Sequence, residues 1–232
     1  ISDPGVKIAD LPAGRINHHW TKNIVASHDG RYLYVSVGSN SNIAENGMDN
    51  ELDRAGILEI DITSGHRRVF ASGLRNPVGM DFNPKDRSLW TNDNQVDGMG
   101  DDQPPGELNR IASAGLDFGF PWYGGGKVRT NEYKNDTPPA NAVFPQVEQA
   151  AHAADLGLIF YTGTMFPAKY RGAIFSTQHG SWNRTVPVGA RLMVTYLKDD
   201  GNVAGKSEPF AEGWNDHGYY LGRPVDVAQL PD

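Results

Sequence analysis

The stretch Arg75-Asn-Pro-Val-Gly-Met-Asp-Phe-Asn-Pro84 opens with a polar residue, continues as a short apolar-rich run and closes on a turn. The same layout, opened by a polar or small residue, recurs three more times, with openings at His19, Ala153 and Arg223. Recurrence of one layout along a chain indicates that one supersecondary unit is repeated. Three of the four opening residues are His or Arg, so repeats arranged around one axis would gather a base and two guanidinium groups.

The residues after each opening favour strands over helices. Residues 31–37 alternate between apolar and polar with the period of two that is typical of a half-buried strand. Turn residues such as Gly, Asn and Pro separate the apolar runs. The runs that we interpret as strands are 23–26, 31–37, 56–62, 67–71, 78–82, 88–91, 107–111, 156–161, 173–177 and 191–197. Residues 147–154 are the one segment for which we expect a turn or two of helix.

Four strands in sequence, joined by hairpin-like turns, predict an all-β fold of the β-propeller type, with four-stranded antiparallel blades. The chain carries about three blades and the start of a fourth, whereas closed propellers have about four to eight. We therefore expect residues 1–232 to be a single β-propeller domain. We also expect it to be a fragment that lacks N-terminal blades and the C-terminal closing segment.

Composition narrows the classes of partner. The formal net charge is −7 and no run of Lys or Arg stands out, so neither nucleic acid nor an anionic membrane surface is expected as a partner. No stretch approaches the roughly 18 apolar residues of a membrane-spanning helix, so no membrane insertion is expected. Cysteine is absent, which excludes disulfides and thiolate metal ligands.

In a propeller blade, the start of the first strand and the end of the second lie on the same rim, near the axis. The unusual polar residues of this chain fall at those two kinds of position. They are His18, His19, Arg75, Asn76 and Arg223 at first-strand starts, and residues 38–42, 92–97, 101–102 and 178–184 at second-strand ends. The opposite turns carry ordinary turn residues. The pattern therefore predicts a functional site on one face.

Each of these residues also has a structural interpretation. His19 alone is more often a structural histidine than a base, and Arg75 could simply cap a loop. The acids between Asp93 and Asp102 suit a Ca²⁺ ion, yet a solvated acidic loop is an equal alternative. Taken together, a base and guanidinium groups suit an anionic planar cofactor and proton abstraction. Gly124-Gly-Gly126 has neither the spacing nor the context of a dinucleotide-binding loop.

Several longer motifs resemble a known family. They are Gly73-Leu-Arg-Asn-Pro-Val-Gly-Met-Asp-Phe82, Leu89-Trp-Thr-Asn-Asp-Asn94, Met99-Gly-Asp-Asp-Gln-Pro-Pro-Gly-Glu-Leu-Asn109 and Phe118-Gly-Phe-Pro121. They are similar to the glucose/sorbosone dehydrogenase family, soluble quinoproteins that use pyrroloquinoline quinone (PQQ) on a six-bladed propeller. Residues 17–23 and 178–184 resemble the L-sorbosone dehydrogenase-like branch. The resemblance covers nearly the whole chain.

The resemblance implies a role for individual residues. It makes His19 the base that takes the proton of a sugar hydroxyl and Arg75 the group that stabilises negative charge on the quinone. It assigns cofactor contacts to Asn76 and Arg223, and further contacts to the loop of His179 and Arg184, leaving open which of those two reaches the cofactor. It places Ca²⁺ in the loop that begins at Asp93, held by backbone carbonyls near Gln95 and Val96.

At two positions the chain departs from the motifs of the resembled family. Ser39 follows Gly38 where glucose-oxidising relatives have an Asp that orients the base, and Gly106 stands where the motif has an acid. The leading hypothesis is PQQ- and Ca²⁺-dependent oxidation of a sugar, with electrons passed to a quinone or cytochrome in the periplasm or outside the cell. A Ca²⁺-dependent propeller lactonase and a non-catalytic propeller that binds carbohydrate or protein remain as alternatives.

Overall fold

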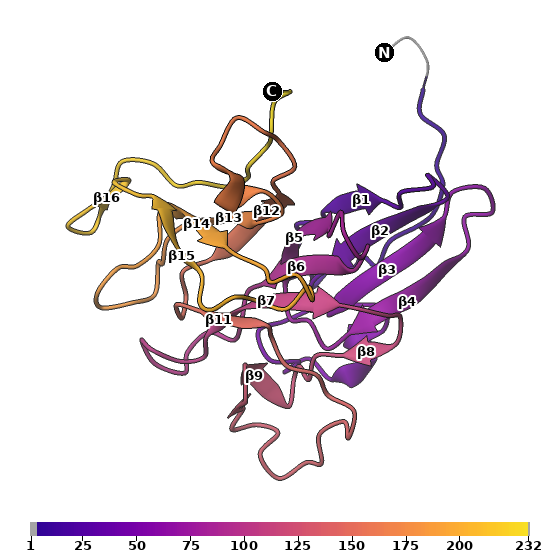
Figure 1. Cartoon of the computed structure of the whole chain (residues 1–232). Coiled ribbons are helices and arrows are strands. Elements are labelled where there is room, and N and C mark those ends of the chain that lie inside the picture. Colours follow the sequence, from indigo (N-terminus) through magenta and orange to yellow (C-terminus); the bar gives the residue numbers. More distant parts are fainter. Residues whose placement is uncertain (1–3, 232) are drawn as a thin grey trace.

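The computed structural model describes residues 4–231 and contains three main sheets, each built on four antiparallel strands, the first of which gains a fifth, parallel strand (Figure 1). Between residues 4 and 231 there is no α-helix, and the two helical segments are single 3-10 turns, Met48–Glu51 and Ala168–Tyr170. The all-β prediction is confirmed. No helix in this part of the chain has the length and hydropathy needed to cross a membrane.

Each sheet is an up-and-down blade, named here blade 1, blade 2 and blade 3 in chain order. Blade 1 consists of β1 (Ile24–Ala26), β2 (Tyr32–Val37), β3 (Gly56–Asp61) and β4 (Arg67–Ser72), with β8 (Leu116–Asp117) added in parallel to β4. Blade 2 consists of β5 (Pro77–Phe82), β6 (Leu89–Asp93), β7 (Gly106–Ile111) and β11 (Val147–Gln149). Blade 3 consists of β12 (Asp155–Phe160), β13 (Ile174–Gln178), β14 (Arg191–Thr195) and β15 (Glu208–Ala211).

Two small hairpins lie outside the blades. They pair β9 (Tyr123–Gly125) with β10 (Val128–Arg129), and β16 (Asn215–Asp216) with β17 (Tyr219–Tyr220). Neither hairpin is predicted by the sequence pattern, because each strand has only two or three residues.

The expected helix at residues 147–154 is wrong. Val147–Gln149 forms β11, which pairs antiparallel with β7 and completes blade 2. Its side chains are buried, exposed and buried in turn, which is the period of a strand. The segment returns to blade 2 after the long excursion that follows β7, and pairing with an existing strand edge decides its conformation.

The opening at Arg223 does not lead into a strand. Residues 223–231 run beside blade 3 as irregular chain, and one backbone bond, from Gly157 N to Val225 O (3.0 Å), joins the two. This segment therefore covers part of β12 without starting a new sheet within the described residues.

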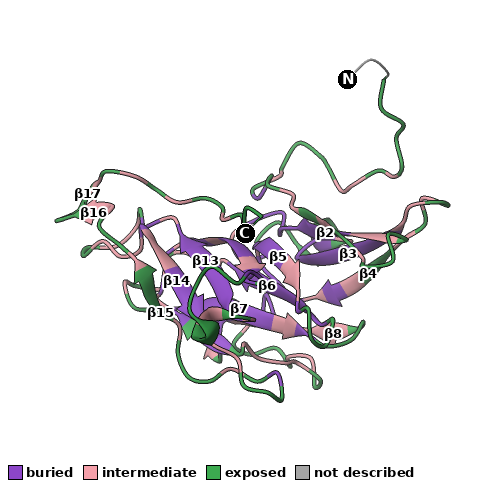
Figure 2. Cartoon of the chain, turned by 45° about the horizontal axis from the view of Figure 1, so that its top comes forward, coloured by how far each residue is buried: buried purple, intermediate pink, exposed green. Residues whose placement is uncertain are grey.

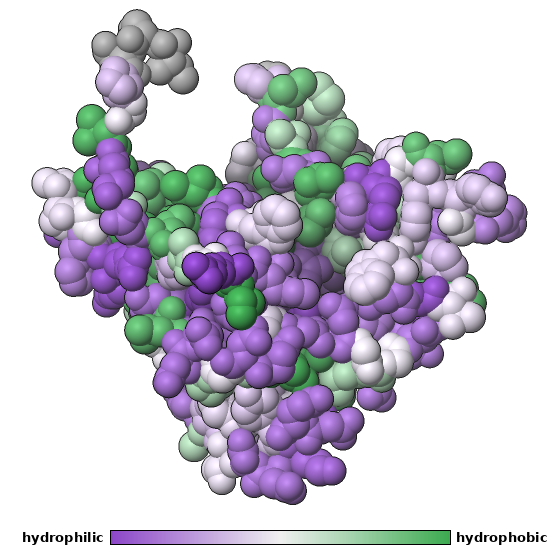
Figure 3. All heavy atoms as spheres, turned by 180° about the vertical axis from the view of Figure 1, so that it is seen from behind, coloured by the Kyte–Doolittle hydropathy of each residue, from purple (hydrophilic) through white to green (hydrophobic). Residues whose placement is uncertain are grey.

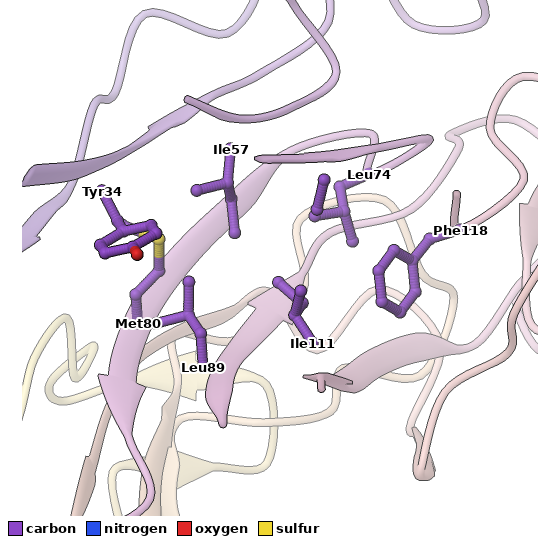
Figure 4. Packing of buried hydrophobic residues seen from close by; sticks show 8 residues of the cluster. Tyr34, Ile57, Leu74, Met80, Leu89, Ile111 and Phe118 are labelled. Carbon is purple, nitrogen blue, oxygen red and sulfur yellow. The ribbon is translucent and has the colours of Figure 1, made fainter. Parts of the chain in front are cut away.

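Two apolar clusters hold the blades against each other. Between blades 1 and 2 lie Tyr34, Ile57, Ala71, Leu74, Met80, Leu89, Ile111 and Phe118 (Figure 4). Between blades 2 and 3 lie Trp90, Leu108, Val147, Leu158, Phe160 and Ile174. Burial is concentrated in the strands, and exposed residues in the connecting loops (Figure 2). The surface seen in Figure 3 is mostly hydrophilic, with hydrophobic residues in separate groups.

The inner strands of blades 2 and 3 approach each other closely. A Cβ built on Gly79 in β5 would lie 2.2 Å from the carbonyl oxygen of Leu156 in β12. No side chain fits that space, so glycine is required for the two blades to meet at the axis. The close approach brings the segment that precedes β5 next to the segment that precedes β12.

Candidate active site

A cavity of about 280 Å³ lies where these loops converge. Its walls come from the segment before β1, the β4–β5 connection, the loop after β6, the start of β7, and the segments before β12 and after β13. The lining residues are His18, His19, Arg75, Asn76, Asn94, Gln95, Asp97, Pro104, Gly106, His152, Ala153, Ala154, Asp155, Leu156 and Trp182. First-strand starts and second-strand ends thus meet around one cavity.

His19 is buried in the wall of this cavity with a fixed tautomer. Its Nδ1 lies 2.9 Å from the backbone oxygen of Ser39, and because a carbonyl oxygen only accepts, Nδ1 carries the hydrogen. The lone pair is therefore on Nε2. Burial, together with the nearby charge of Arg75, lowers the pKa of His19 to about 3. The imidazole is neutral at ordinary pH and offers an unprotonated nitrogen.

Arg75 is held rigidly beside His19. Its Nε donates to Asn42 O (2.8 Å), its Nη1 to Asn94 O (3.1 Å), and its Nη2 to Asn42 Oδ1 (2.6 Å) and Asp97 Oδ2 (3.1 Å). The side chain is only 3% exposed. Burial lowers the pKa of Arg75, and the charges of Asp97 and Asp93 oppose that effect. The guanidinium remains positive and cannot turn away.

Asp93 lies behind the cavity wall and orients the β4–β5 connection. Its carboxylate accepts hydrogen bonds from the backbone N–H groups of Arg75 (3.0 Å) and Asn76 (2.6 Å) and from Gln95 Nε2 (2.8 Å). The side chain is fully buried, and this burial raises the pKa of Asp93. Its oxygens are directed at N–H groups, so its contribution in the structure is to position Arg75 and Asn76.

Two amide oxygens at the cavity are buried without a protein partner. They are Oδ1 of Asn76 and Oε1 of Gln95, and both residues line the cavity. A buried acceptor without a donor is costly, and such an atom is normally satisfied by a ligand, an ion or water. The pair therefore marks the part of the wall where a donor or a cation fits.

Val96 lies behind the loop in a small apolar cluster with Phe120, and its N–H donates to Gly124 O (3.0 Å). Within residues 4–231 no three His, Asp or Glu side chains come together as metal ligands. A cation near this loop would therefore depend on backbone and amide oxygens, the donor type that the resemblance implies for Gln95 and Val96.

His179, Arg184 and Arg223 lie outside the cavity lining. His179 Nδ1 lies 3.1 Å from Pro224 O, and Arg223 Nε donates to His179 O (3.2 Å) while its guanidinium lies over the ring of Tyr220 (4.7 Å). Arg184 donates to Asp102 Oδ1 (2.9 Å) and to the backbone oxygen of Asp101. In the structure these three side chains hold neighbouring loops to one another.

His152 and Asp155 are lining residues that the sequence pattern did not indicate. Nε2 of His152 lies 2.8 Å from Gly100 O and 3.0 Å from Gln103 O, and Asp155 is 1% exposed at the first position of β12. Burial raises the pKa of Asp155 to about 7. A sequence signal exists for both, because His152 precedes Ala153, the opening of the third repeat, and Asp155 follows it by two residues.

The comparisons with known proteins agree with this architecture. Residues 6–181 match the family model described as Glucose / Sorbosone dehydrogenase. An uncharacterized protein of Borreliella burgdorferi is 34% identical over 218 residues, which cover 91% of this chain and 58% of that protein. The chain thus spans less than two thirds of the length of this relative.

Solved structures show the same fold. The iodide structure of a Trichoderma reesei carbohydrate-active enzyme of Family AA12 matches with a TM-score of 0.72 at 21% identity, covering 91% of this chain and 63% of that one. The PQQ-bound aldose sugar dehydrogenase of Streptomyces coelicolor matches with a TM-score of 0.62 at 19% identity, covering 89% and 51%. The three sheets are therefore blades of a partial β-propeller. On the strength of the family match over most of its length, the chain belongs to the glucose/sorbosone dehydrogenase family.

Proposed function

We propose that the protein oxidises a sugar with PQQ and Ca²⁺, using His19 as the base. The observation that carries the proposal is the buried His19, whose Nδ1–H is held by the Ser39 carbonyl and whose Nε2 is left free beside Arg75. Membership of the family supports sugar oxidation in general. The aldose sugar dehydrogenase of Streptomyces coelicolor, solved with PQQ, supports the choice of cofactor.

The residues present fit an anionic quinone cofactor. Arg75 supplies a fixed positive charge, and Asn76 supplies an amide whose oxygen has no protein partner. The unpartnered Gln95 Oε1 and the carbonyls near Val96 are oxygen ligands of the kind that Ca²⁺ takes. When bound there, PQQ would supply the acceptor for the hydride of the sugar carbon. His179, Arg184 and Arg223 would act in this proposal through the loops that they hold.

His19 would remove the hydroxyl proton at Nε2. Its neutral state down to about pH 3 means that the base needs no prior deprotonation at any pH from 5 to 8. The tautomer is set by a backbone carbonyl, the role that an Asp has in the glucose-oxidising relatives. Since burial, and after it the charge of Arg75, lowers the pKa of His19 and disfavours a charged imidazolium, the proton taken from the sugar would pass on to solvent rather than stay on the ring.

Activity, substrate and acceptor belong to the proposal for the whole protein, because the chain spans 58% of its curated relative. We propose an aldose or a sorbosone-type aldehyde as substrate, a quinone or cytochrome as acceptor, and a location in the periplasm or outside the cell. The lactonase alternative needs carboxylates that hold the metal directly. The Asp93 oxygens instead accept N–H groups, so no observation favours that alternative.

The test is reconstitution of the protein in its natural full length with PQQ and Ca²⁺, followed by dye-linked oxidation of aldoses. We expect His19→Ala to lower kcat/KM by about 10²–10⁴-fold, the contribution typical of a general base. His66→Ala, at an exposed histidine, is the matched control and should leave turnover unchanged. Full activity of His19→Ala, or hydrolysis of lactones without PQQ, would overturn the proposal.

A further inference from the structure

Gly106 opens β7 at the cavity wall, and space is the reason for its lack of a side chain. A Cβ built there would lie 2.3 Å from Oδ2 of Asp155 and 3.4 Å from Cβ of Gln149. Its φ does not lie in the left-handed region that favours glycine. The position therefore excludes a side chain chiefly because the carboxylate of Asp155 occupies that volume.

Asp155 is fixed in this place by a row of polar residues across blade 3. Gln178 Nε2 donates to Asp155 Oδ1 (2.9 Å), and Arg191 Nε donates to Gln178 Oε1 (2.7 Å). The three residues are register partners on β12, β13 and β14. With Oδ1 tied to Gln178, Oδ2 is the oxygen that lies against Gly106, and both residues line the cavity.

The cavity consequently has two chemically different sides. One side has Asn76 and the guanidinium of Arg75, which is already paired with the carboxylate of Asp97, while Asp155 brings a second carboxylate from the neighbouring blade. A carboxylate accepts hydrogen bonds strongly, and hydroxyl groups are its natural donors in a buried setting. A polyhydroxylated ligand satisfies both sides at once.

We propose that Asp155 accepts a hydrogen bond from a hydroxyl of the bound sugar and so determines which sugars are held, and that Gly106 is required to leave room for it. The inference rests on the proposed function and names its recognition residue. Gly106 stands where the resembled motif has an acid, so in this chain the carboxylate comes from position 155, across the boundary between two blades.

Moving the carboxylate from position 155 to position 106 gives the most specific test of this proposal. Gly106→Asp alone places two carboxylates in one volume and should abolish sugar binding. Gly106→Asp combined with Asp155→Gly puts a single carboxylate back from the other strand and should restore binding to within about fivefold of the natural protein. Asp155→Asn and Gly106→Ala, which remove or displace the carboxylate, should each weaken binding about tenfold or more.

The matched control is Asp81→Asn. Asp81 is a half-buried acid on β5 whose carboxylate accepts from the backbone N–H groups of Phe82 and Phe160 (both 2.8 Å) and does not line the cavity. Its replacement should lower the thermal midpoint without changing sugar affinity.

The experiment measures D-glucose binding to the cofactor-free protein by isothermal titration calorimetry, KM and kcat after loading with PQQ and Ca²⁺, and the thermal midpoint of every variant. We expect Asp155→Asn to raise KM and Kd together, with a smaller change in kcat. Unchanged affinity in both Asp155→Asn and Gly106→Ala would overturn the inference. So would a loss that follows the thermal midpoint in all variants, Asp81→Asn included.

The outcomes separate this inference from the proposed function. Glucose binding that Asp155→Asn weakens, in a protein that does not oxidise sugars, would overturn the function and support the inference. Sugar oxidation with an unchanged KM in Asp155→Asn would do the reverse. A natural protein that neither binds nor oxidises glucose and other aldoses would contradict both.

Discussion

Blades 2 and 3 share one strand topology but handle buried charge differently beneath the cavity. In blade 2, Asp93 on β6 faces Glu107 on β7 as a register partner, and both carboxyl groups are buried. In blade 3, Asp155 is joined through Gln178 to the guanidinium of Arg191. Blade 2 thus places two acids side by side, whereas in blade 3 the amide of Gln178 lies between an acid and a guanidinium.

The difference shows that the strand pairing of a blade does not determine which buried charges lie side by side. Burial raises the pKa of Glu107, and the charge of Asp93 raises it further. Burial also raises the pKa of Asp155, while the charge of Arg191 acts in the opposite direction. The same strand pairing therefore permits two arrangements. In blade 2 the ionisation of one acid disfavours the ionisation of the other, whereas in blade 3 the positive charge of Arg191 favours ionised Asp155. Substitutions at Asp93, Arg191 and Glu107 separate the two rows, and one at Ser39 tests the turn outside both rows that holds His19.

The largest effect is expected from Asp93→Ala. The change leaves the N–H groups of Arg75 and Asn76 and the amide of Gln95 without their acceptor in a buried place. We expect a loss of about 3–5 kcal/mol in the free energy of unfolding, measured by urea denaturation. A loss below about 1 kcal/mol would show that Asp93 does not organise this connection.

Arg191→Met tests the row in blade 3 and should cost less. It removes the hydrogen bond from Arg191 to Gln178, and we expect about 1–2 kcal/mol of destabilisation by the same measurement. It should also raise the pKa of Asp155, because the opposing positive charge is gone. Carboxyl NMR titration measures that shift. A cost equal to that of Asp93→Ala would remove the contrast between the rows.

Glu107→Gln tests the opposed ionisation in blade 2. Between the pKa of an unfolded glutamate, about 4.3, and the raised pKa in the folded protein, the folded state binds more protons than the unfolded state. Stability therefore falls as pH rises through this window. We expect the variant to reduce the difference in urea midpoint between pH 5 and pH 8, by the equivalent of about 1 kcal/mol or more. An unchanged difference would assign the dependence to other groups.

The smallest effect is expected from Ser39→Ala. It removes the hydroxyl that donates to Glu51 (2.9 Å), while the backbone oxygen that accepts from His19 stays in place. We expect a cost of about 1 kcal/mol in stability and kcat within about threefold of the natural value. A large fall in kcat with unchanged stability would show that the Ser39 side chain, rather than its carbonyl, controls His19.

Much of the fold follows from the sequence because strand periodicity is a local property. The alternation of residues 31–37 and the turns around Asn83 mark β2 and β5 without any tertiary information. β11 could not be predicted in this way, since three residues after a long excursion carry little pattern. Its conformation comes from pairing with β7.

The candidate site was only partly predictable for a similar reason. His19, Arg75, Asn76 and Gln95 occupy repeat positions that the topology brings together, and all four line the cavity. Arg184 and Arg223 share the chemistry but not the place, because bonds to nearby backbone carbonyls direct them elsewhere. Which way a long side chain turns depends on such partners, and sequence spacing does not contain them.

The bond from His19 to Ser39 has a consequence for variation in this protein. The acceptor that fixes the imidazole is part of the main chain, so no exchange of side chain at position 39 can delete it and no change of pH can protonate it in the working range. The orientation of the imidazole is therefore set by the path of the turn after β2. Mutations that change the backbone of that turn, rather than its side chains, are the ones that would disturb His19.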